Sequence, residues 1–322
     1  MLNRIMTLKH ASNCLLSVFF LGMTACAYYP QTEVQWQSEL EMNHPLVGHI
    51  IKTDTQHSIS DSQLVEELAE ADYVLIGEKH DNPDHHLLQN WLLTQLLPNA
   101  KYQVTYEMMT YDQQSQLDTL NASSLTSDIA TAANFQTSGW APQMYLPLLQ
   151  TSLNKGATIS GGNLPKEQIM TLYSANPASL KPANRFTTMN VLNDAQMLTL
   201  DKYIFEQHCE LMPMSQVGPM SKIQIAKDAS LAFSMVNSSA PKNILITGNF
   251  HANKTLGVPV HLAQLEPKAT SLIVQIVEVE PGKTEPSDYL KVDDQTADYL
   301  WFTPKWSNRD YCDDIKAKGN QL

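Results

Sequence analysis

The sequence predicts an α/β protein of three layers, in which a mostly parallel sheet carries helices on both faces together with a helical lid or insertion. Short apolar segments of strand length alternate along the chain with longer amphipathic segments. Strands separated by helices imply right-handed crossovers, which place the strands parallel to one another in one sheet. The chain has 322 residues, of which 43% are hydrophobic and 17% charged, a composition typical of a globular domain with a substantial core.

Local patterns predict the individual elements. The segments 46–51 and 57–59 are expected to form a small hairpin. Ser60 can cap one helix, and the sequence Asp81-Asn82-Pro83 is typical of the start of another. Compact apolar runs predict strands at 73–76, 102–106, 157–159, 243–247 and 272–279, and a late edge strand at 300–302. Long helical regions are expected at about 187–209 and 220–236, and the lid at about 110–150 or 165–235.

The first 25 residues are expected to be a secretion signal outside the fold. Arg4 and Lys9 give it a positive start, and an apolar run too short to span a membrane follows. Small residues then precede Cys26, which predicts a lipoprotein signal peptide with Cys26 acylated after cleavage. Several acyl chains give stable membrane anchoring. Residues 26–45 would be a tether to a single domain at 46–322. The alternative is an ordinary signal peptide cut near Ala25 or Ala27.

The location and charge of the mature chain follow from this interpretation. Ala27 after the cysteine resembles sorting to the outer membrane of Gram-negative bacteria, where the domain would face the periplasm. The net charge of −12 argues against nucleic acid as a partner. Cys209 and Cys312 would lie in an oxidising compartment, where a disulfide between them is expected. Two free thiols are the alternative.

Polar side chains that can carry chemistry follow four of the expected strands. In parallel sheets, ligands bind beyond the carboxyl ends of the strands. The pattern Gly-x-x-His occurs there twice, at 77–80 and at 248–251, so both histidines are expected in one site. The alternative is that these side chains only bond to backbone at the starts of the next helices. The strand-end residues are Glu78, His80, Glu107, Asn163 and His251.

Seven stretches of the chain carry a family resemblance. They are HPLVGHI, YVLIGEKHDNPDHHLLQ, GWAPQMYLPLL, GGNLPKEQI, IQIAKDASLA, GNFHANKTLGVP and DYLWFTP, in order over about residues 44 to 304. They resemble the ChaN family of iron-regulated haem-binding lipoproteins, within the wider TraB, Tiki and erythromycin-esterase-like superfamily. Lys227 stands where the family pattern usually has Arg, which puts a guanidinium role there in doubt. The resemblance implies an α/β fold with a helical lid, haem as ligand, and a place in iron acquisition.

Haem iron needs an axial ligand, for which a tyrosine phenolate or an imidazole can serve. Tyr145 lies in an apolar, aromatic segment and is the expected ligand, with Tyr111 and Tyr106 in reserve. His80 or His251 would ligate the iron or hydrogen-bond to a phenolate ligand. The sequence has no Cys-x-x-Cys-His, which excludes covalent attachment of the c type.

The two haem propionates need local cations in an acidic protein. The candidate cations are Lys79, Lys166 and Arg185. Glu78, Glu107 and Asn163 would complete the haem pocket. A homodimer is also expected, because a flat ligand on a strand-end surface would otherwise be half exposed.

Three function classes fit these features. The first is a haem-binding lipoprotein without turnover, which exchanges haem with an outer-membrane receptor or transport system. The second is a metal-dependent hydrolase, since Tiki-like members use paired Gly-x-x-His motifs. His80, His251 and Glu78 or Glu107 would then bind a divalent metal ion, and the other glutamate would be the general base. The third is an interaction lipoprotein whose site has lapsed.

Overall fold

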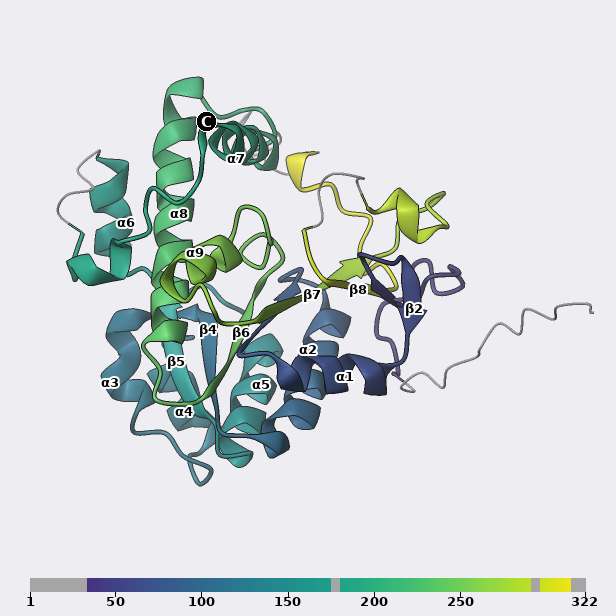
Figure 1. The fold of residues 1–322 in the computed structure, drawn as a ribbon, viewed down its shortest axis with the longest axis horizontal. Helices are drawn as coiled ribbons and strands as arrows, with labels where there is room; N and C mark the ends of the chain where they lie inside the picture. The colour runs from purple at the N-terminus through teal and green to yellow at the C-terminus, as the bar shows by residue number, and fades with distance from the viewer. Residues whose placement is uncertain (1–33, 175–179, 291–295, 314–322) are drawn as a thin grey trace, which may run out of the picture. The chain divides into compact units, whose positions relative to one another are not determined.

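An eight-stranded sheet forms the centre of the protein (Figure 1). We describe it from a computed structural model that covers residues 34–174, 180–290 and 296–313. The expected signal peptide, Cys26 and the tether up to residue 33 lie outside these described residues. The strands are β1 Ile50–Lys52, β2 His57–Ile59, β3 Tyr73–Glu78, β4 Tyr102–Thr110, β5 Thr158–Asn163, β6 Lys242–Gly248, β7 Ser271–Glu278 and β8 Tyr299–Thr303.

The strand order is β2-β1-β8-β7-β3-β6-β4-β5. The six strands from β8 to β5 are parallel, and the β1–β2 hairpin adds two antiparallel strands at one side. The predicted α/β class with a mostly parallel sheet is therefore confirmed. The prediction of an edge strand at 300–302 is wrong, because β8 lies between β7 and β1. The hairpin, more than 200 residues away in sequence, covers the edge that β8 would otherwise expose.

Helices cover both faces of the sheet. They are α1 Asp61–Glu70, α2 Pro83–Leu96, α3 Gln114–Leu117, α4 Thr126–Ala132, α5 Pro142–Asn154, α6 Lys166–Tyr173, α7 Asp194–Gln207, α8 Met214–Val236 and α9 Val258–Leu265, with a short 3-10 helix η4 at Ala183–Phe186. The start of α2 matches its prediction, since the Asn82 side chain accepts hydrogen bonds from the backbone of Asp84 and His85 and Pro83 is the first helical residue.

Two hydrophobic cores result from the alternation of side chains along the strands. In β3, Val74 and Ile76 pack with α1, α2 and α5 on one face of the sheet. Tyr73 and Leu75 point the other way and pack with α8 and α9. The same alternation recurs in the neighbouring strands β6, β7 and β8. These strands are therefore buried on both faces, which is why they are continuous apolar runs in the sequence.

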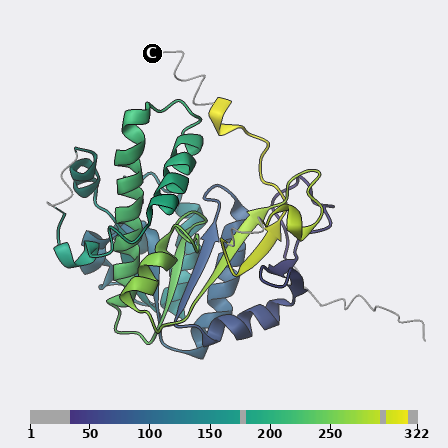
Figure 2. The same ribbon diagram turned by 45° about the horizontal axis from the view of Figure 1, so that its top comes forward.

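A helical cap, made of α6, α7, η4 and the first half of α8, lies beyond the carboxyl edge of the sheet. The long helix α8 packs its second half on the sheet and its first half on α6 and α7. Figure 2 shows α7 and α8 side by side beyond the strands. The cap matches the second range expected for the lid, about 165–235. In the first range, α3 and α4 instead join the layer of α5 under the sheet.

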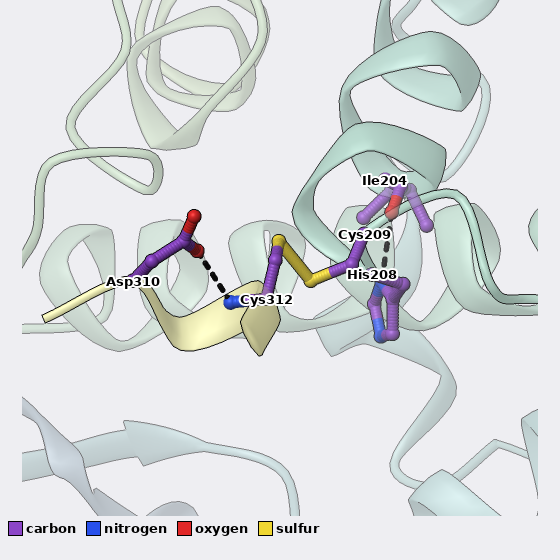
Figure 3. Close-up of a disulfide and its surroundings, with 5 residues drawn as sticks. All are labelled: Ile204, His208, Cys209, Asp310 and Cys312. Carbon is purple, nitrogen blue, oxygen red and sulfur yellow. Dashed lines mark hydrogen bonds between the residues drawn. A yellow bond between two sulfur atoms is a disulfide. The ribbon is translucent and has the colours of Figure 1, made fainter. Parts of the chain in front are cut away.

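A disulfide ties the end of the chain to this cap. The sulfur atoms of Cys209, just after α7, and Cys312 are bonded (Figure 3). His208 donates a hydrogen bond to the carbonyl oxygen of Ile204 beside it.

The domain also begins earlier than the expected boundary at residue 46. The backbone N–H groups of Gln37 and Ser38 donate to the buried carboxylate of Asp84, and Leu40 pairs with Lys305.

The helices of the described residues are too short or too polar to span a membrane, and none of them is a candidate for a transmembrane segment.

Candidate functional site

The site lies where the chain connections diverge at the carboxyl ends of two neighbouring strands. After β3 the chain crosses through α2 to β4, on one side of the sheet. After β6, which is the neighbour of β3, it crosses through α9 to β7 on the other side. A crevice opens outside the sheet wherever two adjacent strands lead in opposite directions. This topology brings the two Gly-x-x-His segments, 77–80 and 248–251, next to each other.

A strand-end cleft of about 620 Å³ occupies this position. Its floor is formed by the ends of β3, β6 and β7, and its outer wall by Tyr203, Ile204 and Gln207 of α7 with Gln224 of α8. Lys305, after β8, closes another side. Ligand sites of drug-sized molecules typically have volumes of about 300–1,000 Å³, so the strand-end cleft can accept a large organic ligand.

His80 contacts a buried carboxylate and a buried phenol. Its Nδ1 donates to Glu78 Oε1 at 2.6 Å, and the Tyr145 hydroxyl lies 3.3 Å from the same oxygen and 3.4 Å from Nδ1. The edge of the Trp140 ring packs against the imidazole, with centroids 4.9 Å apart. The His80 side chain is 45% exposed, whereas that of Glu78 is fully buried.

His251 is enclosed between two buried carboxylates. Its Nδ1 donates to Asp228 Oδ1 at 2.5 Å, and its Nε2 lies 3.4 Å from Glu107 Oε1. Glu107 Oε2 accepts from the Thr247 hydroxyl at 2.7 Å and from the backbone N–H of Gly248 at 2.8 Å. Glu107 Oε1 is also 4.0 Å from His80 Nε2, so this one carboxylate faces both histidines.

These contacts favour the charged forms of both histidines. Burial opposes protonation of His80, but its hydrogen bond to Glu78 and the charges of Glu78 and Glu107 outweigh burial and raise its pKa to about 9. Burial is likewise outweighed at His251, where Glu107 and Asp228 raise the pKa to about 10. Burial alone would raise the pKa of Glu107, but the neighbouring His251 and His80 hold it well below its usual range.

Gly248 is required by the close approach of His80. A Cβ atom at this position would lie 2.8 Å from His80 Cε1 and 3.0 Å from Nε2. At Gly77 a Cβ atom would lie 2.5 Å from the side-chain oxygen of Asn249. The glycine of each Gly-x-x-His segment therefore lets the two segments lie against each other.

Tyr145, the expected axial ligand, lies beneath the histidine layer and does not line the cleft. It is 1% exposed, and burial together with the charge of Glu78 raises its pKa far above the usual range. Asn163 does not line the cleft either. Its side chain donates a hydrogen bond to the carbonyl oxygen of Glu107. Tyr106 is buried and bonds to Ser152.

Two further expected haem contacts lie elsewhere. Tyr111 donates to the carbonyl oxygen of Lys181, and its ring packs against the Arg185 guanidinium at 4.3 Å. Both residues line a different pocket, so they do not belong to the strand-end cleft. Lys166, at the start of α6, does not line the cleft either. Only Lys79 of the three expected cations does, and it is paired with Glu278 at 3.0 Å.

Three residues that line the cleft and one that contacts His251 were not predicted from the sequence. Asp228 lies in the quoted stretch IQIAKDASLA, but only the packing of α8 on the sheet brings it to His251. Tyr203 and Phe250 stack with ring centroids 4.2 Å apart and planes inclined by 18°, and both line the cleft. Lys305 lines it without an ion pair to any described residue. A stacked aromatic wall had no signal in the sequence, because its rings come from α7 and from the segment after β6.

No group of three or more His, Cys, Asp or Glu side chains in the described part of the chain is arranged to hold a metal ion. Aromatic rings and imidazoles line the strand-end cleft together, and such a lining suits a porphyrin, since a porphyrin offers a flat apolar face and an iron at its centre.

Comparisons with known proteins concern the family and the fold of the chain. The family model described as haem-binding uptake, Tiki superfamily, ChaN matches residues 64–262. Among solved structures, ChaN of Campylobacter jejuni, described as a case of cofacial haem binding, has a TM-score of 0.65 and 24% identity over 78% of this chain and 95% of that chain. A mutant of the erythromycin esterase EreC in its open conformation has a TM-score of 0.43 and 14% identity over 78% of this chain and 79% of that chain. No curated protein matches the sequence.

Proposed function

The chain belongs to the haem-binding uptake family of the Tiki superfamily, the family of ChaN, and on this premise we propose that it binds haem in the strand-end cleft and acts in haem uptake. The membership confirms the resemblance indicated by the sequence motifs. The observation that carries the proposal is the strand-end cleft itself, which has a volume of about 620 Å³ and is lined by the stacked Tyr203 and Phe250 rings together with His80 and His251. No enzymatic turnover is part of this proposal.

The porphyrin would contact the Tyr203 and Phe250 rings. Aromatic rings bury large apolar areas when a ligand covers them. Tyr203 belongs to α7 of the cap and Phe250 follows β6 of the sheet. A bound porphyrin would therefore contact both parts and hold them together.

Two side chains of the cleft are suited to the iron. The Tyr203 hydroxyl forms no hydrogen bond with a described residue, and His80 is the more exposed of the paired histidines. A phenolate is a hard ligand that suits ferric iron, and an imidazole is the commoner haem ligand. His251 is less suited, because its side chain is only 8% exposed and its Nε2 lies 3.4 Å from Glu107.

The experiment is a haem titration of the purified protein, followed in the Soret region. Tyr203→Phe and His80→Ala are tested beside Tyr173→Phe, a control at an exposed tyrosine outside the cleft. We expect a saturable Soret band of defined stoichiometry in the wild type and the control. A changed band position or lower affinity in one cleft variant would identify the ligand. A wild-type protein that gives no saturable band would refute haem binding.

We also propose that Cys26 is acylated and anchors the protein in the outer membrane, facing the periplasm, where it would exchange haem with a receptor or transport system. The support is the signal pattern before Cys26 and the disulfide of Cys209 with Cys312, which requires an oxidising compartment. Labelling of cells with radioactive palmitate should mark the wild type and leave Cys26→Ala unlabelled. Equal labelling of both would refute the anchor.

A homodimer is the last part of the proposal. ChaN of Campylobacter jejuni is described as binding haem cofacially. In this protein the outer face of a haem in the open cleft would remain exposed, and two such faces could cover each other. Sedimentation analysis should then show dimers that form on addition of haem. Saturated protein that stays monomeric would contradict this arrangement.

A further inference from the structure

A second pocket, independent of the strand-end cleft, lies at the free edge of β5. It has a volume of about 290 Å³. The edge strand forms one wall, and Tyr111, Arg185 and the end of α8 form the others. The Gln114 side chain bonds to the backbone of Ile159 and Gly161, so it covers part of the strand edge. No part of this pocket is used by the proposed haem site.

Arg185 is held rigidly in this pocket. Its Nη1 donates to the carbonyl oxygen of Ser230 at 2.8 Å and to the hydroxyls of Ser230 and Ser234 at 3.2 and 2.7 Å. The guanidinium packs against the Tyr111 ring at 4.3 Å and against the Phe233 ring at 4.7 Å. Its position is therefore fixed before any ligand arrives, which lowers the entropy cost of binding.

One edge of the guanidinium has no partner among the described residues. Arg185 Nε is buried without a hydrogen-bond partner, and no described residue accepts a hydrogen bond from Nη2. Nη2 is therefore the nitrogen that can donate to a ligand in the pocket, and a guanidinium binds a carboxylate through charge-assisted hydrogen bonds. No described carboxylate forms an ion pair with Arg185, and burial lowers its pKa to about 10. The chain has only three arginines, Arg4, Arg185 and Arg309, and Arg185 is the one that lines this pocket.

We propose that this pocket binds a small hydrophilic carboxylate through the guanidinium of Arg185. The rest of the lining is polar and includes Ser160, Asn237 and Ser239, which suits a ligand that carries hydroxyl or amide groups. Asp118 also lines the pocket, and its negative charge favours a singly charged ligand over a phosphate. The volume lies at the lower limit of about 300 Å³ for drug-sized ligand sites, so the ligand is a small one.

The first experiment compares two probes with similar bodies. D-Gluconate carries a carboxylate on a polyhydroxylated chain, and D-sorbitol has the same chain without the carboxylate. A ligand that binds only the folded state raises the thermal midpoint. We expect gluconate to raise the midpoint of the purified protein above that in sodium chloride of equal ionic strength, and sorbitol at the same concentration to give no such saturable rise. Inorganic phosphate should act more weakly than gluconate.

Variants test whether Arg185 is responsible for the rise in the thermal midpoint. Arg185→Lys keeps the charge but lacks the paired donors, so it should weaken gluconate binding by about tenfold or more. Arg309→Lys should bind as the wild type does. Haem titration of Arg185→Lys should match the wild type, which separates this proposal from the haem proposal and shows that the variant is folded.

Chemical modification gives a second test, which uses the wild-type protein. Phenylglyoxal reacts with guanidinium groups, and peptide mapping can follow Arg185 and Arg309 separately. Gluconate should slow modification of Arg185 and leave the rate at Arg309 unchanged. Failure of gluconate both to shift the midpoint and to protect Arg185, or an equal effect of sorbitol, would overturn the proposal. A shift that persists in Arg185→Lys would overturn it as well.

Discussion

Glu107 is the residue on which both histidines of the site converge. An isolated buried carboxylate is strongly unfavourable, and it persists only when it is paired and hydrogen-bonded. Here the Thr247 hydroxyl and the Gly248 N–H bond to one oxygen, and His251 lies 3.4 Å from the other. Glu107 thereby fixes the end of β6 and the position of His251 together. The sequence indicated a strand-end carboxylate, but its partners come from a strand about 140 residues later.

The charge on His251 makes stability dependent on pH. Its pKa in the folded protein is about 10, above the usual value of about 6.5 in an unfolded chain. The stabilisation is therefore fully present below about pH 6.5 and is lost as the pH rises through 10. We expect the free energy of unfolding, measured in urea, to fall steadily from about pH 7 to about pH 10.

Titration by NMR checks the cause of this fall. The Cε1–H resonances of His251 and His80 should shift only above about pH 8. Titration of both imidazoles near their ordinary value, or a stability that stays level over that range, would contradict the charged pairs.

Lys305 is predicted to bind a haem propionate. It lines the strand-end cleft without an ion pair to a described residue, whereas Lys79 is paired with Glu278 and Asp81. Lys305→Gln should weaken haem binding by about tenfold, because one charge-assisted contact contributes about 1.4 kcal/mol or more. The same variant should bind haem dimethyl ester as well as the wild type does.

Lys268→Gln, at an exposed lysine outside the cleft, is the matched control and should leave both affinities unchanged. If haem binds the wild type normally and Lys305→Gln weakens haem and its ester equally, Lys305 does not contact a propionate.

At the scale of elements, the strand–loop segments after β3 and β6 form the site together. The repeated Gly-x-x-His pattern predicted that both histidines would meet, and the neighbouring positions of β3 and β6 explain why they do. The pattern did not reveal the close packing between the segments. The contact of Gly248 with His80 depends on the register in which Glu78 pairs with Gly248.

Gly248→Ala tests this close packing. The added Cβ would lie 2.8 Å from His80 Cε1, so the imidazole must move. Overpacking of this kind typically costs about 1–3 kcal/mol. We expect a lower free energy of unfolding and a weaker or altered Soret band on haem addition.

Gly218→Ala is the control for that variant, because a Cβ at this position of α8 would meet no atom within 4 Å. It should bind haem like the wild type. An unaltered haem spectrum and stability in Gly248→Ala would show that His80 is not confined by the end of β6.

At the scale of the whole domain, the cap and the end of the chain are linked by the disulfide of Cys209 and Cys312, which are 103 residues apart. Removal of a native disulfide typically costs about 2–5 kcal/mol, mainly because the unfolded chain gains freedom. The Cys209→Ser, Cys312→Ser double variant should lose about this much stability in urea. Mass spectrometry with and without reductant should show the bond in the wild type, and its absence there, or equal stability of the double variant, would contradict the prediction.

Local signals in the sequence were enough to predict the fold class, the family and the polar residues at the strand ends. These depend on local alternation, on caps such as Asn82, and on short motifs, and such signals are contained within a few consecutive residues. The sequence also indicated a helical lid at about 110–150 or 165–235, and only the structure showed that the cap lies in the second range. The position of β8 inside the sheet was not predicted, since it depends on pairing with a hairpin far away in sequence.

Which residues line the strand-end cleft became known from the tertiary structure alone. Tyr145 and Tyr203 are both tyrosines on amphipathic helices, yet one lies beneath His80 and the other lines the strand-end cleft. Arg185 and Tyr111, expected beside haem, instead form a separate pocket at the edge of β5. Asp228 reaches His251 because α8 packs its second half on the sheet. The direction of a side chain is fixed by contacts between segments distant in sequence, and no local pattern contains those contacts.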